Sequence, residues 1–116
     1  MPSRSFRNNN PGNIRDSSWT RAQPGFMGHD AEGFAIFSDW GHGVAAITRL
    51  LCSSSYRNLT LREIISRYAP AKENDVNAYV AFVCTRAGIK ADEKITAPHR
   101  LCEVMAAMIV HEGWKS

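Results

Sequence analysis

What the sequence lacks excludes several classes of protein. No apolar run approaches the length that a transmembrane helix needs, and the N-terminal MPSRSFRNNN has no apolar segment of the kind found in signal peptides. There is no C-x-x-C pair for a metal cluster, and there is no internal repeat or low-complexity tract. We therefore expect a chain made in the cytoplasm without a signal peptide, with no membrane insertion, no metal and no cofactor.

Cysteine is also scarce. The sequence has three cysteines, Cys52, Cys84 and Cys102, and each lies in an apolar, helix-like context. An odd number in such surroundings predicts buried thiols in a reducing compartment and argues against a disulfide framework.

The remaining composition is that of an ordinary globular protein. Of the 116 residues, 44% are hydrophobic and 22% are charged, as in soluble globular proteins. A chain of this length can form one hydrophobic core but not two. We therefore predict a single domain over residues 1–116. The net charge of +3 suits an anionic partner such as nucleic acid, an acidic polymer or a cell-wall surface, without choosing between them.

Turn-forming and periodic segments predict a mainly α fold. The first thirty or so residues are rich in Asn, Gly, Pro and Ser and should form a loop that packs on a core, and a short strand follows at Gly33–Phe37. Four later segments combine helical spacing of apolar residues with capping or helix-ending residues. These segments are Ser38–Ser54, Leu59–Pro70, Glu73–Gly88 and Thr96–Gly113, the last with Thr96 as its expected cap. We expect about four helices, a long N-terminal loop and at most a short β-hairpin.

One carboxylate has an unusual position in the last predicted helix. Each helical residue turns by about 100°, so Leu101, Met105, Met108 and Glu112 fall within roughly 60° of one another. Desolvation and the dipole at a helix C-terminus both raise the pKa of a carboxyl group placed there, which suits a general acid. A frayed and solvated helix end is the alternative, and the helical pattern leaves both open.

The segment FRNNNPGNIR, residues 6–15, cannot form the core of a helix or a strand. It requires a turn with exposed amide side chains, whose donors and acceptors suit the N-acetyl and hydroxyl groups of a sugar. A plain Asx-turn loop is the alternative. With the later segments, this loop resembles small phage-encoded and effector-type proteins that carry an RNNNPGNI opening.

The same segments resemble the goose-lysozyme and soluble lytic-transglycosylase group, in a circularly permuted order. NPGNIR is similar to the substrate loop of that group, GHGVAAITRLL to a Gly-led helix, RYAPAKENDVNAY to an element with two tyrosines, and AAMIVHEGW to the catalytic helix. The resemblance covers roughly residues 5–114, and RNNNPGNI is its most specific part. Two departures are the turn YAPAKEND and the short chain after the glutamate.

The resemblance implies a lysozyme-like fold that cleaves the β-1,4 bond between N-acetylmuramic acid and N-acetylglucosamine in peptidoglycan glycan strands. Glu112 would be the general acid and, in a lytic transglycosylase, also the base that takes the proton from the muramyl 6-hydroxyl. A hydrolytic lysozyme would use a second carboxylate, with Glu73 as the first candidate and Asp75 and Glu32 as the others. The alternative is that the acids of ENDV only start the following helix, where the helix dipole favours them. The implied substrate-binding residues are Asn8, Asn10, Asn13, Tyr68, Asn74 and Tyr79, the last of which also suits a core.

Two other classes of function stay open. A non-catalytic phage structural or cell-wall-binding protein would share the fold, since one misplaced carboxylate abolishes activity. TLREIISRYAP and the helix after it resemble a nucleic-acid-binding helical module, but the basic residues are spread along the chain and DVNAYVAFV is too apolar to lie in a groove. We expect no nucleic-acid partner, a monomer, and delivery to the bacterial cell wall or periplasm by a phage particle, a lysis pore or a secretion system.

Overall fold

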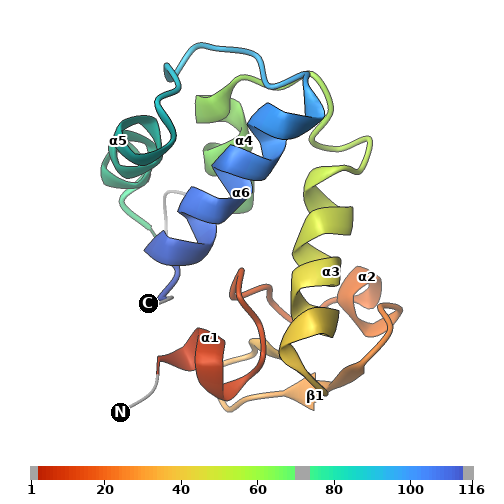
Figure 1. The fold of residues 1–116 in the computed structure, drawn as a ribbon. Helices are drawn as coiled ribbons and strands as arrows, with labels where there is room; N and C mark the ends of the chain where they lie inside the picture. The colour runs from red at the N-terminus through yellow and green to blue at the C-terminus, as the bar shows by residue number, and fades with distance from the viewer. Residues whose placement is uncertain (1–2, 70–73, 114–116) are drawn as a thin grey trace. The chain divides into compact units, whose positions relative to one another are not determined.

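The computed structural model describes residues 3–69 and 74–113. This part of the chain is mainly helical, with six helices and one two-stranded sheet in the order α1, α2, β1, β2, α3, α4, α5, α6 (Figure 1). It forms two compact units: one holds the chain up to Leu50 together with the end from Glu112, and the other is Leu51–His111. That the two units make one domain stays a prediction.

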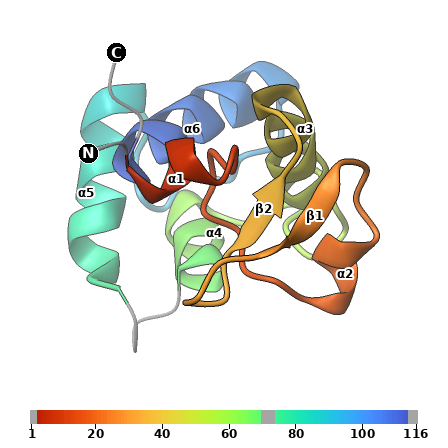
Figure 2. The same cartoon turned by 90° about the horizontal axis from the view of Figure 1, so that it is seen from below.

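The first unit contains two single-turn helices and the predicted hairpin. The helices are α1 (Arg4–Arg7) and α2 (Ser18–Arg21), and the hairpin pairs β1 (Phe26–His29) with β2 (Ala35–Phe37) in antiparallel register. Figure 2 shows α2 beside β1, which is the strand that it contacts. The Ser17 hydroxyl caps α2 by accepting a hydrogen bond from the Thr20 N–H.

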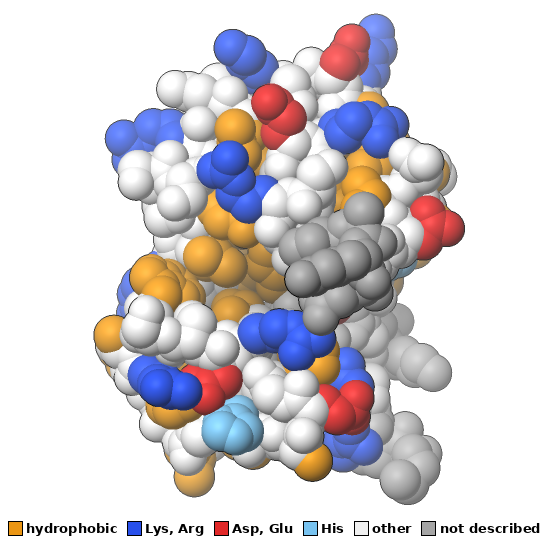
Figure 3. Space-filling view, turned by 180° about the vertical axis from the view of Figure 1, so that it is seen from behind, with side chains coloured by type: hydrophobic (Ala, Val, Ile, Leu, Met, Phe, Trp, Pro, Cys, Tyr) orange, Lys and Arg blue, Asp and Glu red, His pale blue; other side chains and the backbone are white. Residues whose placement is uncertain are grey.

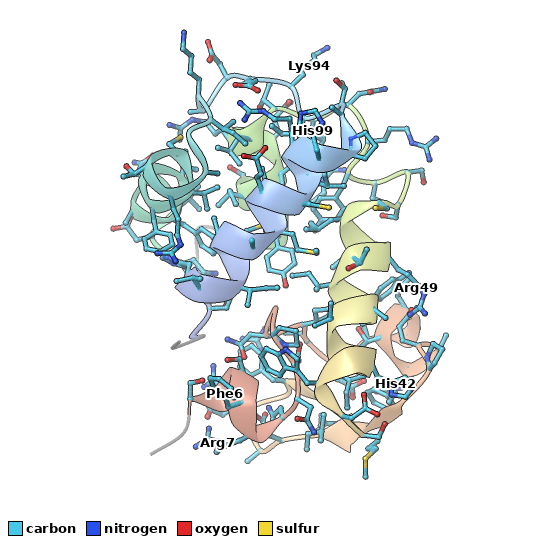
Figure 4. All side chains as sticks on the ribbon, in the orientation of Figure 1. Phe6, Arg7, His42, Arg49, Lys94 and His99 are labelled. Carbon is cyan, nitrogen blue, oxygen red and sulfur yellow. The ribbon has the colours of Figure 1, made fainter. Side chains whose placement is uncertain are left out.

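Helix α3 (Trp40–Leu51) confirms the first of the predicted helices. Asp39 precedes it, and the carboxylate of Asp39 accepts the His42 N–H at 2.8 Å, which satisfies one of the free donors at the helix start. Ile47 is fully buried in the core. Arg49 extends from α3 on the side where α2 lies (Figure 4) and donates to the Gln23 side chain at 3.3 Å.

The second unit is built from α4 (Leu61–Tyr68), α5 (Val76–Ala87) and α6 (Pro98–His111), with α5 packed against both α4 and α6 (Figure 1). The capping box predicted for α4 is present, because Thr60 and Glu63 each accept the other's backbone N–H. Gly88 ends α5 in the left-handed conformation, as predicted. The buried residues of the three helices include Ile64, Ile65, Tyr79, Val83, Val104 and Met108.

Helix α6 has Pro98 in its first turn and Gly113 past its end, as predicted, but it is one residue shorter than predicted at each end. Helix α6 begins at Pro98, and the Ala97 carbonyl accepts the N–H groups of Arg100 and Leu101, so the position before the helix is Ala97 and not Thr96. The helix ends at His111, which leaves Glu112 in the turn that follows.

The prediction that the cysteines are buried is also wrong. Cys52 and Cys102 are exposed and Cys84 is half-buried. On α6 the buried face is centred on Val104, and the direction of Cys102 is roughly 160° away from it. An apolar neighbourhood in the sequence therefore did not place these thiols on the inner face of their helices.

Candidate active site around the first loop

The first loop, residues 8–13, is a tight turn closed by its own backbone. The Asn10 N–H donates to the Ser5 carbonyl at 2.9 Å, and the Asn13 N–H donates to the Asn10 carbonyl at 3.0 Å. Asn9 and Asn13 have φ values of 51° and 48°. Asn is enriched in this left-handed region, because its short polar side chain tolerates it better than most others do. Two of the loop's asparagines are thus explained by backbone conformation.

Asn10 supports the loop from inside. Its side chain is fully buried; Nδ2 donates to the carbonyls of Ile14 and Ala35, both at 2.9 Å, and Oδ1 accepts the Ile14 N–H at 3.0 Å. These bonds tie the loop to strand β2. We therefore assign Asn10 to the loop's architecture and not to direct contact with a substrate.

Asn8 is also buried and contacts the hairpin turn. Its Nδ2 donates to the Asp30 carboxylate at 2.9 Å, and the same carboxylate accepts the N–H groups of Glu32 and Phe34. Burial alone raises the pKa of Asp30, but the hydrogen bonds from Phe34, Asn8 and Glu32 outweigh it and hold that pKa below its usual value. Asn8 therefore supports the turn, and sugar binding is not what its contacts indicate.

Helix α3 approaches the loop through Gly43. A Cβ atom at this position would lie 2.0 Å from the Asn9 carbonyl oxygen and 2.7 Å from Cδ of Pro11, so only glycine permits the approach. The ring of Phe6, labelled in Figure 4, stacks on Trp40 at the start of the same helix with 5.3 Å between ring centroids. The loop is thus held against the first turn of α3 by close backbone packing and an aromatic pair.

Glu112 meets this loop, as predicted. The Asn13 Nδ2 donates to the Glu112 carbonyl at 2.7 Å and to its carboxylate oxygen Oε1 at 3.1 Å, across 99 positions of sequence. Gly113 follows with φ 128°, and a Cβ there would lie 3.1 Å from the Ser3 hydroxyl and 3.2 Å from that of Ser5. The two ends of the described chain are therefore in contact within the first unit.

The predicted location of Glu112 at the centre of an apolar face is wrong. The helix ends one residue earlier, and the buried residues of α6 are Val104, Ala107 and Met108, so its inner face is rotated away from the predicted stripe. Glu112 is half-buried in a turn. Its place is fixed by Asn13 and the turn.

Glu32, one candidate for a second carboxylate, lies in the exposed turn between β1 and β2. Its Oε2 is 2.7 Å from the Arg4 guanidinium. The guanidinium groups of Arg4 and Arg15 both lie over the ring of Phe34, at 4.0 and 4.3 Å from its centroid. This carboxylate is therefore part of an ion pair that joins α1 to the hairpin.

The remaining predicted site residues belong to the second unit. Tyr68 is half-buried at the end of α4, and Asn74 is exposed. Tyr79 is 1% exposed in the core, where its ring lies 3.8 Å from that of His111. Asp75 caps α5 by accepting the Ala78 N–H at 3.0 Å, which confirms the helix-start interpretation for this acid. Glu73 lies outside the described residues.

Sequence analysis missed the roles of Gly43 and Asp30. Glycine in the first turn of a helix is a weak signal by itself, since glycine is disfavoured there and its partner is far away in the sequence. The segment DAEG carried a turn signal for Asp30, but not its bond to Asn8.

Within residues 3–69 and 74–113, no three His, Cys, Asp or Glu side chains are grouped so that they could hold a metal ion. None of the helices in the described ranges has the length and apolar character needed to cross a membrane. On the face shown in Figure 3, the basic side chains are interspersed with acidic and apolar ones.

Comparison with known proteins gives one informative relationship. No model of a known protein family matches the sequence. Protein P5 of Pseudoalteromonas phage PM2 is 36% identical over an alignment of 116 positions, which covers 95% of this chain and 71% of the relative. The chain belongs to the Protein P5 family. This membership associates the chain with bacteriophage, whereas the name Protein P5 states neither an activity nor a ligand. The resemblance to goose-type lysozymes stays a prediction.

Proposed function

We propose that this member of the Protein P5 family is a peptidoglycan-cleaving glycosidase with Glu112 as its general acid. One observation carries the proposal: Asn13 donates to the Glu112 carboxylate at 3.1 Å. This bond joins the loop that resembles a substrate loop to the residue that resembles a catalytic glutamate. The circularly permuted, lysozyme-like fold is part of the same proposal, because it would explain why catalytic groups come from opposite ends of the chain.

The proposed reaction breaks the β-1,4 bond between N-acetylmuramic acid and N-acetylglucosamine. Glu112 gives its proton to the glycosidic oxygen as the bond breaks, and the resulting carboxylate then acts as a base. If it takes the proton from the muramyl 6-hydroxyl, the product is a 1,6-anhydro end and one carboxylate suffices. If it acts with a second carboxylate on water, the product is a reducing end, and Glu73 is the residue we assign to that role.

Among the residues predicted to bind substrate, we retain Tyr68 and Asn74, whose side chains are half-buried and exposed respectively. Asn13 belongs to the proposed site through its hydrogen bond to the Glu112 carboxylate. We propose that the protein reaches the bacterial cell wall by a phage-encoded route, in keeping with its bacteriophage relative. A particle or a lysis pore would each provide such a route.

Digestion of purified sacculi tests the proposal. Wild type should release muropeptides, and Glu112→Gln, which keeps the shape of the side chain and removes its proton exchange, should lower the rate by about 100-fold or more. Glu103→Gln is the matched control, since Glu103 is an exposed residue of α6 whose carboxylate pairs with Arg100 at 3.4 Å. This variant should digest sacculi at the wild-type rate.

Mass spectrometry of the products separates the remaining possibilities. Anhydro ends identify a lytic transglycosylase, and reducing ends identify a lysozyme. No release by wild type would refute the glycosidase proposal and leave the non-catalytic cell-wall-binding or structural role, which sedimentation of the protein with sacculi would then detect. Full activity of Glu112→Gln would refute only the assignment of the acid.

A further inference from the structure

The amide of Asn13 has only one orientation that fits its surroundings. The Glu112 carbonyl oxygen, which can only accept, lies 2.7 Å from the nitrogen, so the Nδ2 end of the amide has to face it. The same nitrogen then also faces Oε1 of the Glu112 carboxylate at 3.1 Å. The opposite end, Oδ1, is buried and accepts no hydrogen bond within the described residues. The amide thus leaves one buried acceptor unsatisfied while both donor contacts reach a single residue.

We propose that Asn13 is the positioning residue of the general acid, and that it directs the transferable proton of Glu112 to Oε2. This inference rests on the proposed function. Because Nδ2 donates to Oε1, that oxygen serves as an acceptor in both protonation states, and the acid proton is carried by the other oxygen. The second contact, to the Glu112 carbonyl, fixes the backbone from which the carboxylate extends.

The backbone on both sides allows this arrangement. Asn13 has φ 48° and its side chain reaches Glu112, and Gly113 has φ 128°, which most residues with a side chain avoid. Ser3 and Ser5 lie close to Gly113, so the turn that carries Glu112 is held between them and Asn13. A carboxylate held at both its main chain and its side chain loses little freedom on reaching the geometry for proton transfer.

The test uses substitutions that keep the left-handed backbone. Asn13→Gly adopts φ near 48° without strain and removes both donor contacts, whereas Asn13→Asp keeps the shape and replaces the donor with an acceptor. Asn58→Gly is the matched control, since Asn58 has φ 60° and belongs to the second unit. Each variant is measured for thermal melting, for kcat and KM on solubilised glycan strands, and for the pH dependence of kcat.

Asn13→Gly should lower kcat roughly 10- to 100-fold with KM nearly unchanged, and it should move the alkaline limb of the pH profile to higher pH. The limb moves up because a donor that favours the charged carboxylate has been removed. Asn13→Asp should show the larger loss, since two carboxylates then face each other. Asn58→Gly should keep both kcat and the pH limb of wild type.

A second measurement keeps this inference separate from the proposed function. The side-chain carboxyl ¹³C signal of Glu112, assigned with Glu112→Gln, is titrated in wild type and in Asn13→Gly. A higher midpoint in Asn13→Gly shows that Asn13 stabilises and holds the Glu112 carboxylate even if wild type digests no glycan, in which case only the glycosidase proposal fails. An unchanged midpoint together with wild-type kcat and an unmoved limb overturns the role of Asn13 while the glycosidase activity stands.

Discussion

At the scale of single residues, asparagine does two different things in the first loop. Asn9 and Asn13 occupy a backbone conformation that most residues avoid. The buried side-chain amide of Asn10 instead forms hydrogen bonds with backbone groups, among them the N–H and carbonyl of Ile14. The side chains of these residues also tie the loop to distant parts of the sequence: Asn10 reaches Ala35 on β2, and Asn13 reaches Glu112. The loop is therefore organised around a buried amide.

Replacing Asn10 by Ala should destabilise the protein by about 2–4 kcal/mol. The substitution leaves the buried Ile14 N–H without its acceptor and removes two donors from buried carbonyls, and each unsatisfied buried group costs about 1–3 kcal/mol. The free energy of unfolding from urea denaturation followed by circular dichroism measures the loss.

Asn77→Ala is the control for this change. The Asn77 side chain accepts from Arg62 at 3.0 Å on the exposed surface, so its loss should change stability by no more than about 0.5 kcal/mol. If Asn10→Ala unfolds at the same urea concentration as Asn77→Ala, the buried amide does not hold the loop to β2.

At the scale of elements, the contact between α3 and the loop depends on one glycine. Gly43→Ala places a methyl group 2.0 Å from the Asn9 carbonyl oxygen, and both partners are backbone, so the loop or the helix has to move. Such overpacking costs about 1–3 kcal/mol. Gly43→Ala should therefore lower the free energy of unfolding in urea. Under the proposed function it should also lower the rate at which sacculi are digested.

Gly41 provides a matched comparison in the same helix. A Cβ at Gly41 meets only the Asp39 carboxylate at 3.4 Å, and alanine favours helix over glycine by about 1 kcal/mol, so Gly41→Ala should leave stability unchanged or raise it. Equal stabilities for the two variants would show that the close approach at Gly43 yields without cost.

Local signals in the sequence were enough to predict the longer elements. Helices α4 and α5 carry a capping box and a terminal glycine, and these act over three or four residues. The single-turn helices α1 and α2 escaped prediction because four residues are too few to show a helical period. The end of α6 was misplaced by one residue, because the contact that takes Glu112 out of the helix comes from Asn13, far away in the chain.

The candidate site was predictable in part. Its two poles, the first loop and Glu112, came from a resemblance, and the structure places them in hydrogen-bond contact. The different roles of the asparagines were not predictable, because Asn8 and Asn10 bond to residues of the hairpin that are distant in the sequence. Residue type indicated which hydrogen bonds the asparagines could make. Long-range packing decided which of their side chains are buried in contacts that support the loop.

At the scale of the whole molecule, two kinds of titrating group, carboxyl groups and a histidine, make the stability of the fold depend on pH. The pKa values of Asp16, Asp39 and Glu63 lie below their ordinary 3.8 or 4.5 because each carboxylate accepts hydrogen bonds, chiefly from Arg21, His42 and Thr60 respectively. A carboxyl group with a lowered pKa stabilises the fold above its ordinary value, and this contribution is lost as the pH falls through the lowered value. Protonation of these carboxyl groups therefore lowers the stability of the fold only below about pH 4.5.

His111 affects the stability of the fold at a higher pH than the carboxyl groups do. The His111 side chain is exposed, but desolvation still holds its pKa below the usual 6.5, and its ring lies 3.8 Å from Tyr79 and 5.2 Å from Phe82. Because the unfolded chain binds the proton more readily, the contribution of this residue is present above pH 6.5 and is lost as the pH falls towards the lowered value. His111→Phe, which keeps an aromatic ring and cannot be protonated, should remove this loss.

The melting temperature Tm, measured at intervals from pH 8 to about pH 3, checks this expectation. The Tm of His111→Phe minus that of wild type should increase as the pH falls below 6.5. His99→Gln, a change at an exposed position in the first turn of the same helix, should follow the wild-type curve. A constant difference between His111→Phe and wild type would mean that this ring is protonated equally in the folded and unfolded chains. The decline below about pH 4.5 should persist in all three proteins, because the carboxylates that cause it are unchanged.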